Sequence, residues 1–206
     1  MARHQRRDGN AIKFRGNQMK NSLLVGVIIA SFFVSFQAKA DDVNVYDYVS
    51  VKAAITVSTD EFDGTTTIAA PAIDIVGGKD VLGGDAIYPV TLSYRTHISG
   101  TKTIFASLFI VYTDRTWKKY HSVHRGGQSY DLVDVLSQVQ SCYKRNCIFS
   151  EIKRLPLRRQ DLNSAVSVGG FKFKVSGQMD SFIVDIPAPY IKAFLEVIDE
   201  NSVQPN

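Results

Sequence analysis

The sequence is poor in cysteine, with only Cys142 and Cys147 among 206 residues. A zinc site would need two further ligands nearby, and a redox dithiol usually has two intervening residues rather than the four found here. Because both thiols lie in the part of the chain that follows an export signal, we expect them to form a disulfide. Four intervening residues suit a hairpin loop whose flanking positions face each other, so we place a hairpin there.

No apolar stretch is long enough to cross a bilayer as a helix. The longest, Leu23–Phe36, has 14 residues, whereas a spanning helix needs roughly 20. A basic zone precedes it, and the small residues Ala38 and Ala40 follow at the positions that signal peptidase accepts. We therefore expect residues 1–40 to be a signal peptide cleaved after Ala40, with Met19 as an alternative start and an uncleaved anchor as the alternative outcome. No membrane span is expected after cleavage.

The chain lacks the common signatures of enzymes and nucleotide-binding proteins. It contains no Gly-x-Ser-x-Gly elbow, no Gly-x-x-x-x-Gly-Lys loop and no Gly-x-Gly-x-x-Gly turn. The acids around 60–64 match no calcium-loop pattern. His121 and His124 would point to opposite faces of a strand. We therefore predict no catalytic residues, no metal site and no cofactor, although an enzyme site assembled only by folding stays open.

Charge is distributed unevenly along the chain. After residues 1–40 are removed, 17 basic and 19 acidic residues remain, so the isoelectric point near 9.0 belongs to the targeting segment and does not indicate nucleic acid as a partner. Residues 41–85 hold nine acids against two lysines, and residues 86–159 hold twelve basic residues against four acids. Either these regions neutralise each other in the fold, or the basic region presents a face to an anionic partner.

A basic face would draw on cations at predicted strand ends and at the hairpin tip. Its candidate residues are Arg115, Lys118, Lys119, Lys144 and Arg145. The run from 115 to 121 also interleaves cations with aromatic side chains, which suits charge pairing and stacking on a polyanion or glycan. The alternative places Trp117 in the core and the lysines in water. Lys153-Arg154 and Arg158-Arg159 carry the same two interpretations.

Short apolar stretches separated by turn signals predict a mainly β fold. We expect an antiparallel β-sandwich or an open barrel-like sheet, with a short C-terminal amphipathic helix packed on it. The expected strands are 51–57, 66–76 with a break at Pro71, 90–95, 103–112, 117–123, 130–141, 148–155, 171–175 and 182–186. Two helices are expected, a short one over 158–165 and the C-terminal one after Pro189, whose apolar residues recur at helical spacing.

These patterns predict a single exported β-rich domain over residues 41–206, periplasmic or secreted. Its expected function is non-catalytic: it binds an envelope or secretion partner protein, or an anionic surface polymer. This expectation rests on the class of protein, since β-rich exported domains without catalytic motifs are often binding or structural modules. The alternative is a secreted hydrolase of envelope material. The two differ in whether Asp, Glu or His side chains meet in one enclosed pocket.

Overall fold

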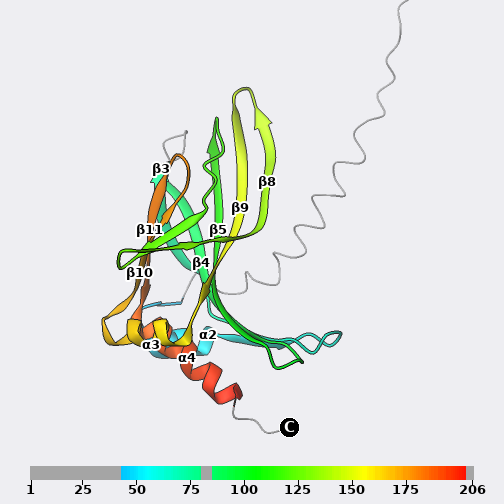
Figure 1. The fold of residues 1–206 in the computed structure, drawn as a ribbon, viewed down its shortest axis with the longest axis vertical. Helices are drawn as coiled ribbons and strands as arrows, with labels where there is room; N and C mark the ends of the chain where they lie inside the picture. Colours follow the sequence, from blue (N-terminus) through cyan, green and yellow to red (C-terminus); the bar gives the residue numbers. More distant parts are fainter. Residues whose placement is uncertain (1–42, 80–84, 203–206) are drawn as a thin grey trace, which may run out of the picture. The chain divides into compact units, whose positions relative to one another are not determined.

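The computed structural model describes residues 43–79 and 85–202, which form two antiparallel sheets with helices packed against them (Figure 1). The predicted signal peptide, with its cleavage residues Ala38 and Ala40 and the alternative start at Met19, lies outside the described residues. The glycine pair at 83–84 lies outside them as well.

The larger sheet, called sheet A, has the strand order β1-β2-β4-β5-β9-β8, and β3 pairs with β4 beside β2. Its strands are β1 (Thr56–Thr59), β2 (Thr66–Ala69), β3 (Ile73–Lys79), β4 (Asp85–Thr96), β5 (Lys102–Asp114), β8 (Val133–Tyr143) and β9 (Asn146–Leu157). The predicted break at Pro71 falls between β2 and β3. The long central strand β5 is the one predicted from the apolar run over 103–112.

The smaller sheet, called sheet B, has the order β11-β10-β6-β7. Its strands are β6 (Ser122–Arg125), β7 (Gln128–Asp131), β10 (Gly170–Ser176) and β11 (Ser181–Pro187). Three helices complete the described fold: α2 (Tyr48–Ala54), α3 (Arg159–Ser167) and α4 (Ala188–Ser202). Figure 1 shows them gathered at one end of the sheets, where α4 packs on both α2 and α3.

The core forms where the apolar faces of the two sheets meet. In β10 every second side chain is buried, as strand geometry requires: Phe171, Phe173 and Val175. On β4 the apolar side chains Tyr88, Val90, Leu92 and Tyr94 face this core, and the intervening Thr91 and Ser93 are buried on the other face. The apolar stripe of α4 extends the same core with Ile191, Phe194, Leu195 and Ile198. The predicted fold class, an open antiparallel β architecture with a packed C-terminal helix, is confirmed.

The predicted strand over 51–57 is wrong in its first part, because residues 48–54 form the helix α2. The side chain of Asp47 caps this helix by accepting hydrogen bonds from the backbone N–H groups of Val49 and Ser50. Val51 is buried, and Lys52 forms ion pairs with α4. Tertiary contact with α4 thus outweighs the preference of β-branched residues for strands.

The predicted strand over 117–123 is also wrong, because the chain leaves sheet A after Asp114 and enters sheet B only at Ser122. The segment from 115 to 121 is held by backbone bonds to the β10–β11 turn: Gln178 N–H donates to Lys118 O at 2.7 Å and His121 N–H to Ser176 O at 3.1 Å. Gly177 is required there, since a Cβ at this position would lie 2.6 Å from Lys118 O. We call residues 115–121 the crossover segment.

The hairpin between β8 and β9 confirms the predicted disulfide. Cys142 and Cys147 face each other in the β8–β9 register, with Cα atoms 4.0 Å apart, and their sulfur atoms are bonded. The ambiguous stretch 130–141 is extended, as the hairpin required: it is divided between β7 and β8.

Replacing both cysteines by serine is expected to lower the free energy of unfolding by about 2 kcal/mol, because so short a loop removes little entropy from the unfolded chain. Urea denaturation of the double variant beside the wild type measures this loss. Thiol labelling of unreduced, denatured protein should find no free cysteine, and labelling of both thiols would contradict the crosslink.

Candidate functional site

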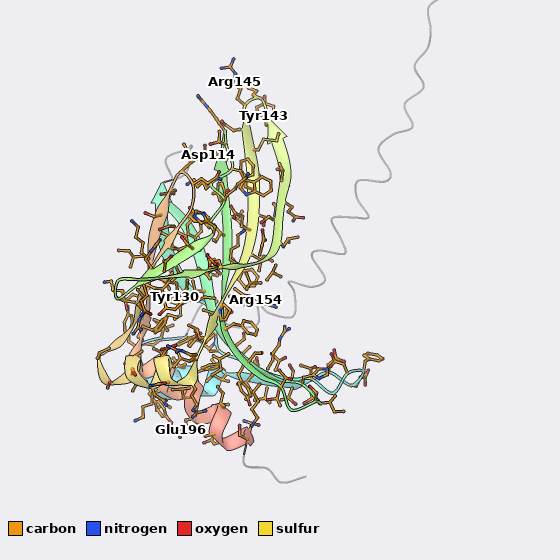
Figure 2. The ribbon with its side chains drawn as sticks, in the orientation of Figure 1. Asp114, Tyr130, Tyr143, Arg145, Arg154 and Glu196 are labelled. Atoms are coloured by element: carbon orange, nitrogen blue, oxygen red, sulfur yellow. A yellow bond between two sulfur atoms is a disulfide. The ribbon has the colours of Figure 1, made fainter. Side chains whose placement is uncertain are left out.

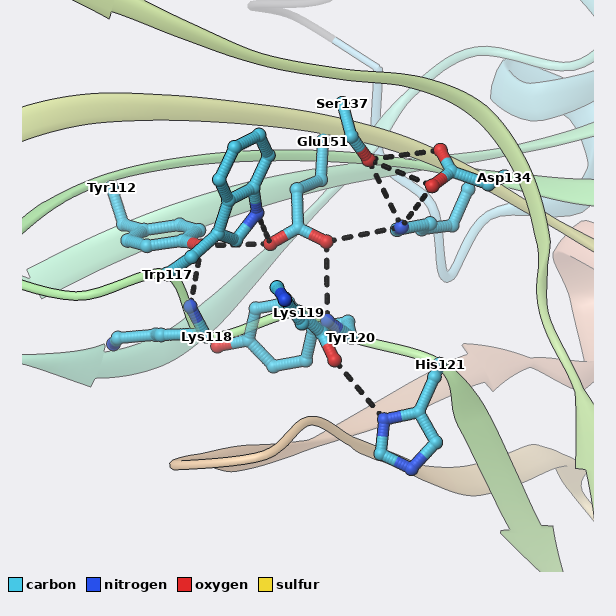
Figure 3. Close-up of polar contacts among 10 residues, drawn as sticks. Tyr112, Trp117, Lys118, Lys119, Tyr120, His121, Asp134, Ser137 and Glu151 are labelled. Atoms are coloured by element: carbon cyan, nitrogen blue, oxygen red, sulfur yellow. Dashed lines mark hydrogen bonds and ion pairs between the residues drawn. The ribbon is translucent and has the colours of Figure 1, made fainter.

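A hollow of about 300 Å³ opens between β8, β9 and the crossover segment (Figure 3). Aromatic, cationic and acidic side chains line it together: Trp117, Lys119, Tyr120, His121, Asp134, Ser137, Glu151 and Lys153. We call it the Glu151 hollow. Three kinds of side chain that an enzyme could use, acids, a lysine and a histidine, line this hollow, so its chemistry bears on the choice between an enzyme and a binding domain.

Glu151 is completely buried on the face of β9 that is turned toward sheet B. One carboxylate oxygen accepts hydrogen bonds from the Tyr112 hydroxyl at 2.7 Å and from Trp117 Nε1 at 3.0 Å. The other accepts the Tyr120 backbone N–H at 3.1 Å and pairs with Lys153 Nζ at 3.1 Å. Four donors therefore saturate the carboxylate, and they tie the crossover segment to sheet A.

Lys153 is similarly saturated. Its ammonium lies 3.1 Å from Glu151, 3.1 Å from Asp134 and 3.2 Å from Ser137 Oγ, and an ammonium has three hydrogen atoms to donate. Ser137 Oγ in turn donates to Asp134 at 2.9 Å. The Ser137 hydroxyl accepts from Lys153 and already donates its proton to Asp134, so this serine–lysine contact is not arranged as a nucleophile and its base.

Two ionisable groups at the hollow have shifted pKa values. Burial raises the pKa of Tyr112, and its hydrogen bond to Glu151 raises it further, so this hydroxyl remains a donor. At Asp134, burial favours a higher pKa, but hydrogen bonds from Ser137 and Lys153 outweigh it and the pKa is lowered. Both shifts stabilise the network as it stands: a neutral phenol donates and an ionised carboxylate accepts.

The histidines are not joined to these acids. His121 lies at the rim, where its Nδ1 contacts the backbone oxygen of Lys119 at 3.0 Å, and His124 Nε2 contacts Ser122 Oγ at 3.3 Å. Neither forms an ion pair with a carboxylate in the part of the chain that the structure describes. Within those residues, no group of three or more His, Cys, Asp or Glu side chains is placed to hold a metal ion.

Lys118, one of the five candidate binding residues, is not accessible: only 6 % of it is exposed. Its ammonium forms an ion pair with Asp180 at 2.8 Å and lies over the ring of Tyr112. Burial would lower the pKa of Lys118, but the hydrogen bond to Asp180 and nearby charges outweigh it and raise that pKa. The expectation that a partner reaches Lys118 is therefore wrong, because this side chain holds the crossover segment against the β10–β11 turn.

The other four candidates are exposed, and three of them meet at one end of sheet A. Asp114 pairs with Cys147, which places Arg115 beside the turn that carries Lys144 and Arg145. Figure 2 shows Arg145 and Tyr143 at the end of the hairpin and Asp114 near it. We call Arg115, Lys144 and Arg145 the basic tip. Lys119 instead lines the Glu151 hollow.

The acidic N-terminal region does not neutralise the basic region through ion pairs in the described residues. Lys118 pairs with Asp180, Arg159 with Asp199, and Lys153 with acids of β8 and β9. No ion pair joins a described carboxylate to a cation of the basic tip. Among the described residues, these three charges are therefore not neutralised by ion pairs.

Exposed apolar side chains continue from the basic tip along the face of sheet A that is turned away from sheet B. The strand register places four of them there: Val111 on β5, Val133 and Leu136 on β8, and Ile148 on β9. Their exposed fractions lie between 36 and 52 %. We call these four residues the outer apolar strip. It lies beside β8, which ends the strand order of sheet A.

Comparison with known protein families, with curated proteins and with solved structures finds no match to this chain. In the described residues, no helix is both long and apolar enough to cross a membrane.

Sequence reasoning missed Glu151, Lys153, Asp134 and Ser137 as a connected group. They meet because β8 and β9 pair in a register that sets Ser137 opposite Glu151 and Asp134 opposite Lys153. One signal was present in the sequence: Phe149, Glu151, Lys153 and Leu155 alternate on one face of a strand, so two charges had to share an apolar face. Charged residues in such a position are almost never buried without partners.

Proposed function

We propose that this chain is an exported, non-catalytic domain that binds an acidic partner protein through the basic tip and the outer apolar strip. The observation that carries the proposal is the position of three exposed cations that form no ion pair with a described carboxylate, at the end of sheet A from which the outer apolar strip extends along β8. Anionic groups on a partner would pair with the cations, and apolar groups would cover the strip.

A protein suits this surface better than a purely anionic polymer. A polyanion draws its affinity from the cations alone, whereas Val111, Ile148 and the 76 % exposed Tyr143 offer apolar area next to them. Aromatic and arginine side chains at the centre of a surface patch are the residues that most often dominate protein–protein affinity. The experiments must therefore distinguish a protein partner from an anionic envelope polymer.

Export agrees with the disulfide, since such crosslinks persist in oxidising compartments and are rare in the cytosol. The periplasm and the extracellular space are both compatible with it. A hydrolase is less well supported: the buried carboxylate of Glu151 and the ammonium of Lys153 are already saturated, and His121 contacts neither of them. We propose no reaction for the Glu151 hollow and infer a structural role for its network.

Reversing the basic tip, with Arg115, Lys144 and Arg145 all changed to Glu, should abolish partner binding while leaving the fold intact. The three side chains are exposed, and substitutions at such positions usually change stability by less than about 0.5 kcal/mol each. A matched control reverses Lys102, Lys174 and Lys192, which are also exposed, form no ion pair among the described residues and lie away from the tip. Binding is measured by retention of partner from the envelope fraction of the native cell, with circular dichroism as the check of folding.

Photo-crosslinking separates a protein partner from a polymer. A photoreactive residue in place of Tyr143 should trap a protein, and one in place of the equally exposed Met179 should not. Binding should weaken as salt rises, because exposed charges are screened over about 8–10 Å at physiological ionic strength. A folded tip-reversed variant that still retains the partner would refute the proposal, and so would crosslinks to polysaccharide alone.

A further inference from the structure

Two arginines flank one aromatic ring on the outer face of sheet A, away from the basic tip. Arg95 on β4 lies with its guanidinium carbon 5.4 Å from the centre of the Phe105 ring, and Arg154 on β9 lies 4.6 Å from it. Phe105 belongs to β5, which runs between β4 and β9, so the three side chains form a diagonal across the sheet. Figure 2 places Arg154 on β9 far from Arg145 at the hairpin end.

These two cations have no carboxylate within ion-pair distance among the described residues. Asp63 lies close enough to Arg95 for that charge to lower its pKa, after the hydrogen bonds with Thr65 and the charge of His97, but the two form no ion pair. Arg154 Nε is buried and has no hydrogen-bond partner. A buried donor without a partner costs free energy, and the cost is greatest when the group is charged.

The charges also repel each other. Burial lowers the pKa of Arg154, and the neighbouring charge of Arg95 lowers it further. Neither guanidinium group forms an ion pair with a described carboxylate, so an anion that contacts both groups would relieve this repulsion. Both guanidinium groups lie over the Phe105 ring, and this contact restricts their movement, which reduces the entropy lost when a ligand binds.

The sheet supplies small hydroxyl side chains around this pair. Ser107 on β5 lies directly opposite Arg154, and Ser93 on β4 lies directly opposite Phe105. Both serines belong to the outer face, and both are largely buried. Their hydroxyl groups are polar and can donate a hydrogen bond to a neighbouring oxygen.

We propose that Arg95 and Arg154, stacked on Phe105, form a binding site for an oxyanion: a phosphate, a sulfate or a carboxylate group. Guanidinium groups present paired N–H donors that match two oxygens of such an anion. The site is separate from the basic tip and does not depend on the function proposed for it. The anion can come from a free small molecule or from an acidic side chain of a bound protein, and the two sources share this chemistry.

Titration of the Arg Nε–Hε resonances by NMR tests the site directly on the domain, with inorganic phosphate, sulfate and acetate as probes at constant ionic strength. We expect a saturable shift of the Arg154 resonance with at least one anion. Arg95→Gln should weaken that affinity at least about tenfold, the loss expected for one charge-assisted hydrogen bond. Arg95 is exposed, so this variant should keep the amide spectrum of the wild type elsewhere.

Arg145→Gln is the matched control, because it removes one cation from the basic tip and should leave the titration of Arg154 unchanged. A response to phosphate or sulfate indicates a tetrahedral ester or free ion as ligand, and a response to acetate alone indicates a carboxylate of a protein. The site is refuted if no probe gives a saturable shift, or if Arg95→Gln and Arg145→Gln alter the titration equally. Loss of partner binding by the tip-reversed variant has no bearing on this result.

Discussion

Replacing Glu151 by glutamine is expected to destabilise the protein by about 3–5 kcal/mol, the cost of removing one partner from a buried ion pair. The carboxylate is fully buried and accepts from Tyr112, Trp117 and the backbone of Tyr120. A glutamine amide would present N–H groups to some of these donors and leave Lys153 without its buried counter-charge. Denaturant unfolding of the variant beside the wild type measures the loss.

Asp134→Asn serves as the control for that substitution. Asp134 contacts the same ammonium at 3.1 Å, but its side chain is 57 % exposed, and water can replace what it provides. We expect a loss below about 1 kcal/mol. Combining Glu151→Gln with Lys153→Met should cost less than the two single changes together, because the second removes the charge that the first leaves unpaired. If Glu151→Gln and Asp134→Asn lowered the free energy of unfolding by the same amount, the network around Glu151 would not be what anchors the crossover segment.

The strands that are half buried were predictable from the sequence, because one face is apolar and the other polar. Phe171, Phe173 and Val175 alternate with lysines, and the hairpin that they predict is present as β10 and β11. The C-terminal helix was also predictable from its apolar face. Ile191, Phe194 and Ile198 recur every three or four residues, as one face of a helix requires, and all three are buried. In these elements local pattern and tertiary environment agree.

The elements that were mispredicted depend on partners far away in the sequence. Residues 51–54 were predicted as part of a strand from their composition, but Lys52 and Val51 are placed by α4, which lies more than 130 residues later in the chain. The crossover segment alternates like a strand, yet Glu151 and Asp180 hold its side chains in a non-repeating arrangement. Periodicity in a short window cannot show which distant carboxylate will bind a lysine or a tryptophan.

The basic face illustrates the same limit. Net charge along residues 86–159 indicated an excess of cations but not which of them would find acids. Lys118 and Lys153 are buried ion-pair partners, whereas Lys144 and Arg145 extend from a turn into solvent. Their position in the hairpin, fixed by the disulfide, was the part of this surface that the sequence predicted correctly. Cross-strand register decided the rest, and it follows from pairing partners rather than from spacing.

The helix α4 owes its stability to docking rather than to its own end charges. Its last turn contains no basic residue, and Asp199 and Glu200 lie near the C-terminal end, where negative charge opposes the helix dipole. What holds it is contact with the sheets and with α2 and α3, together with ion pairs from Lys52 and Arg159. Removing its central apolar contact should therefore have a large effect.

Phe194→Ala is expected to cost about 3–5 kcal/mol, the range for emptying a buried aromatic site, since Phe194 has no exposed surface and lies within the main core cluster. For a domain of this size each kcal/mol lowers the thermal midpoint by about 2–4 °C, so a loss of 3 kcal/mol would appear as a fall of about 6–12 °C.

Lys192→Ala is the control on the same helix. The Lys192 side chain is exposed and its ammonium lies 5.3 Å from the centre of the Tyr48 ring, so this variant should lower the free energy of unfolding by only about 0.5 kcal/mol. Calorimetry of the three proteins under one buffer decides the comparison. If the two variants melt at the same temperature, α4 does not contribute to the core and the packing described for the C-terminal helix is incorrect.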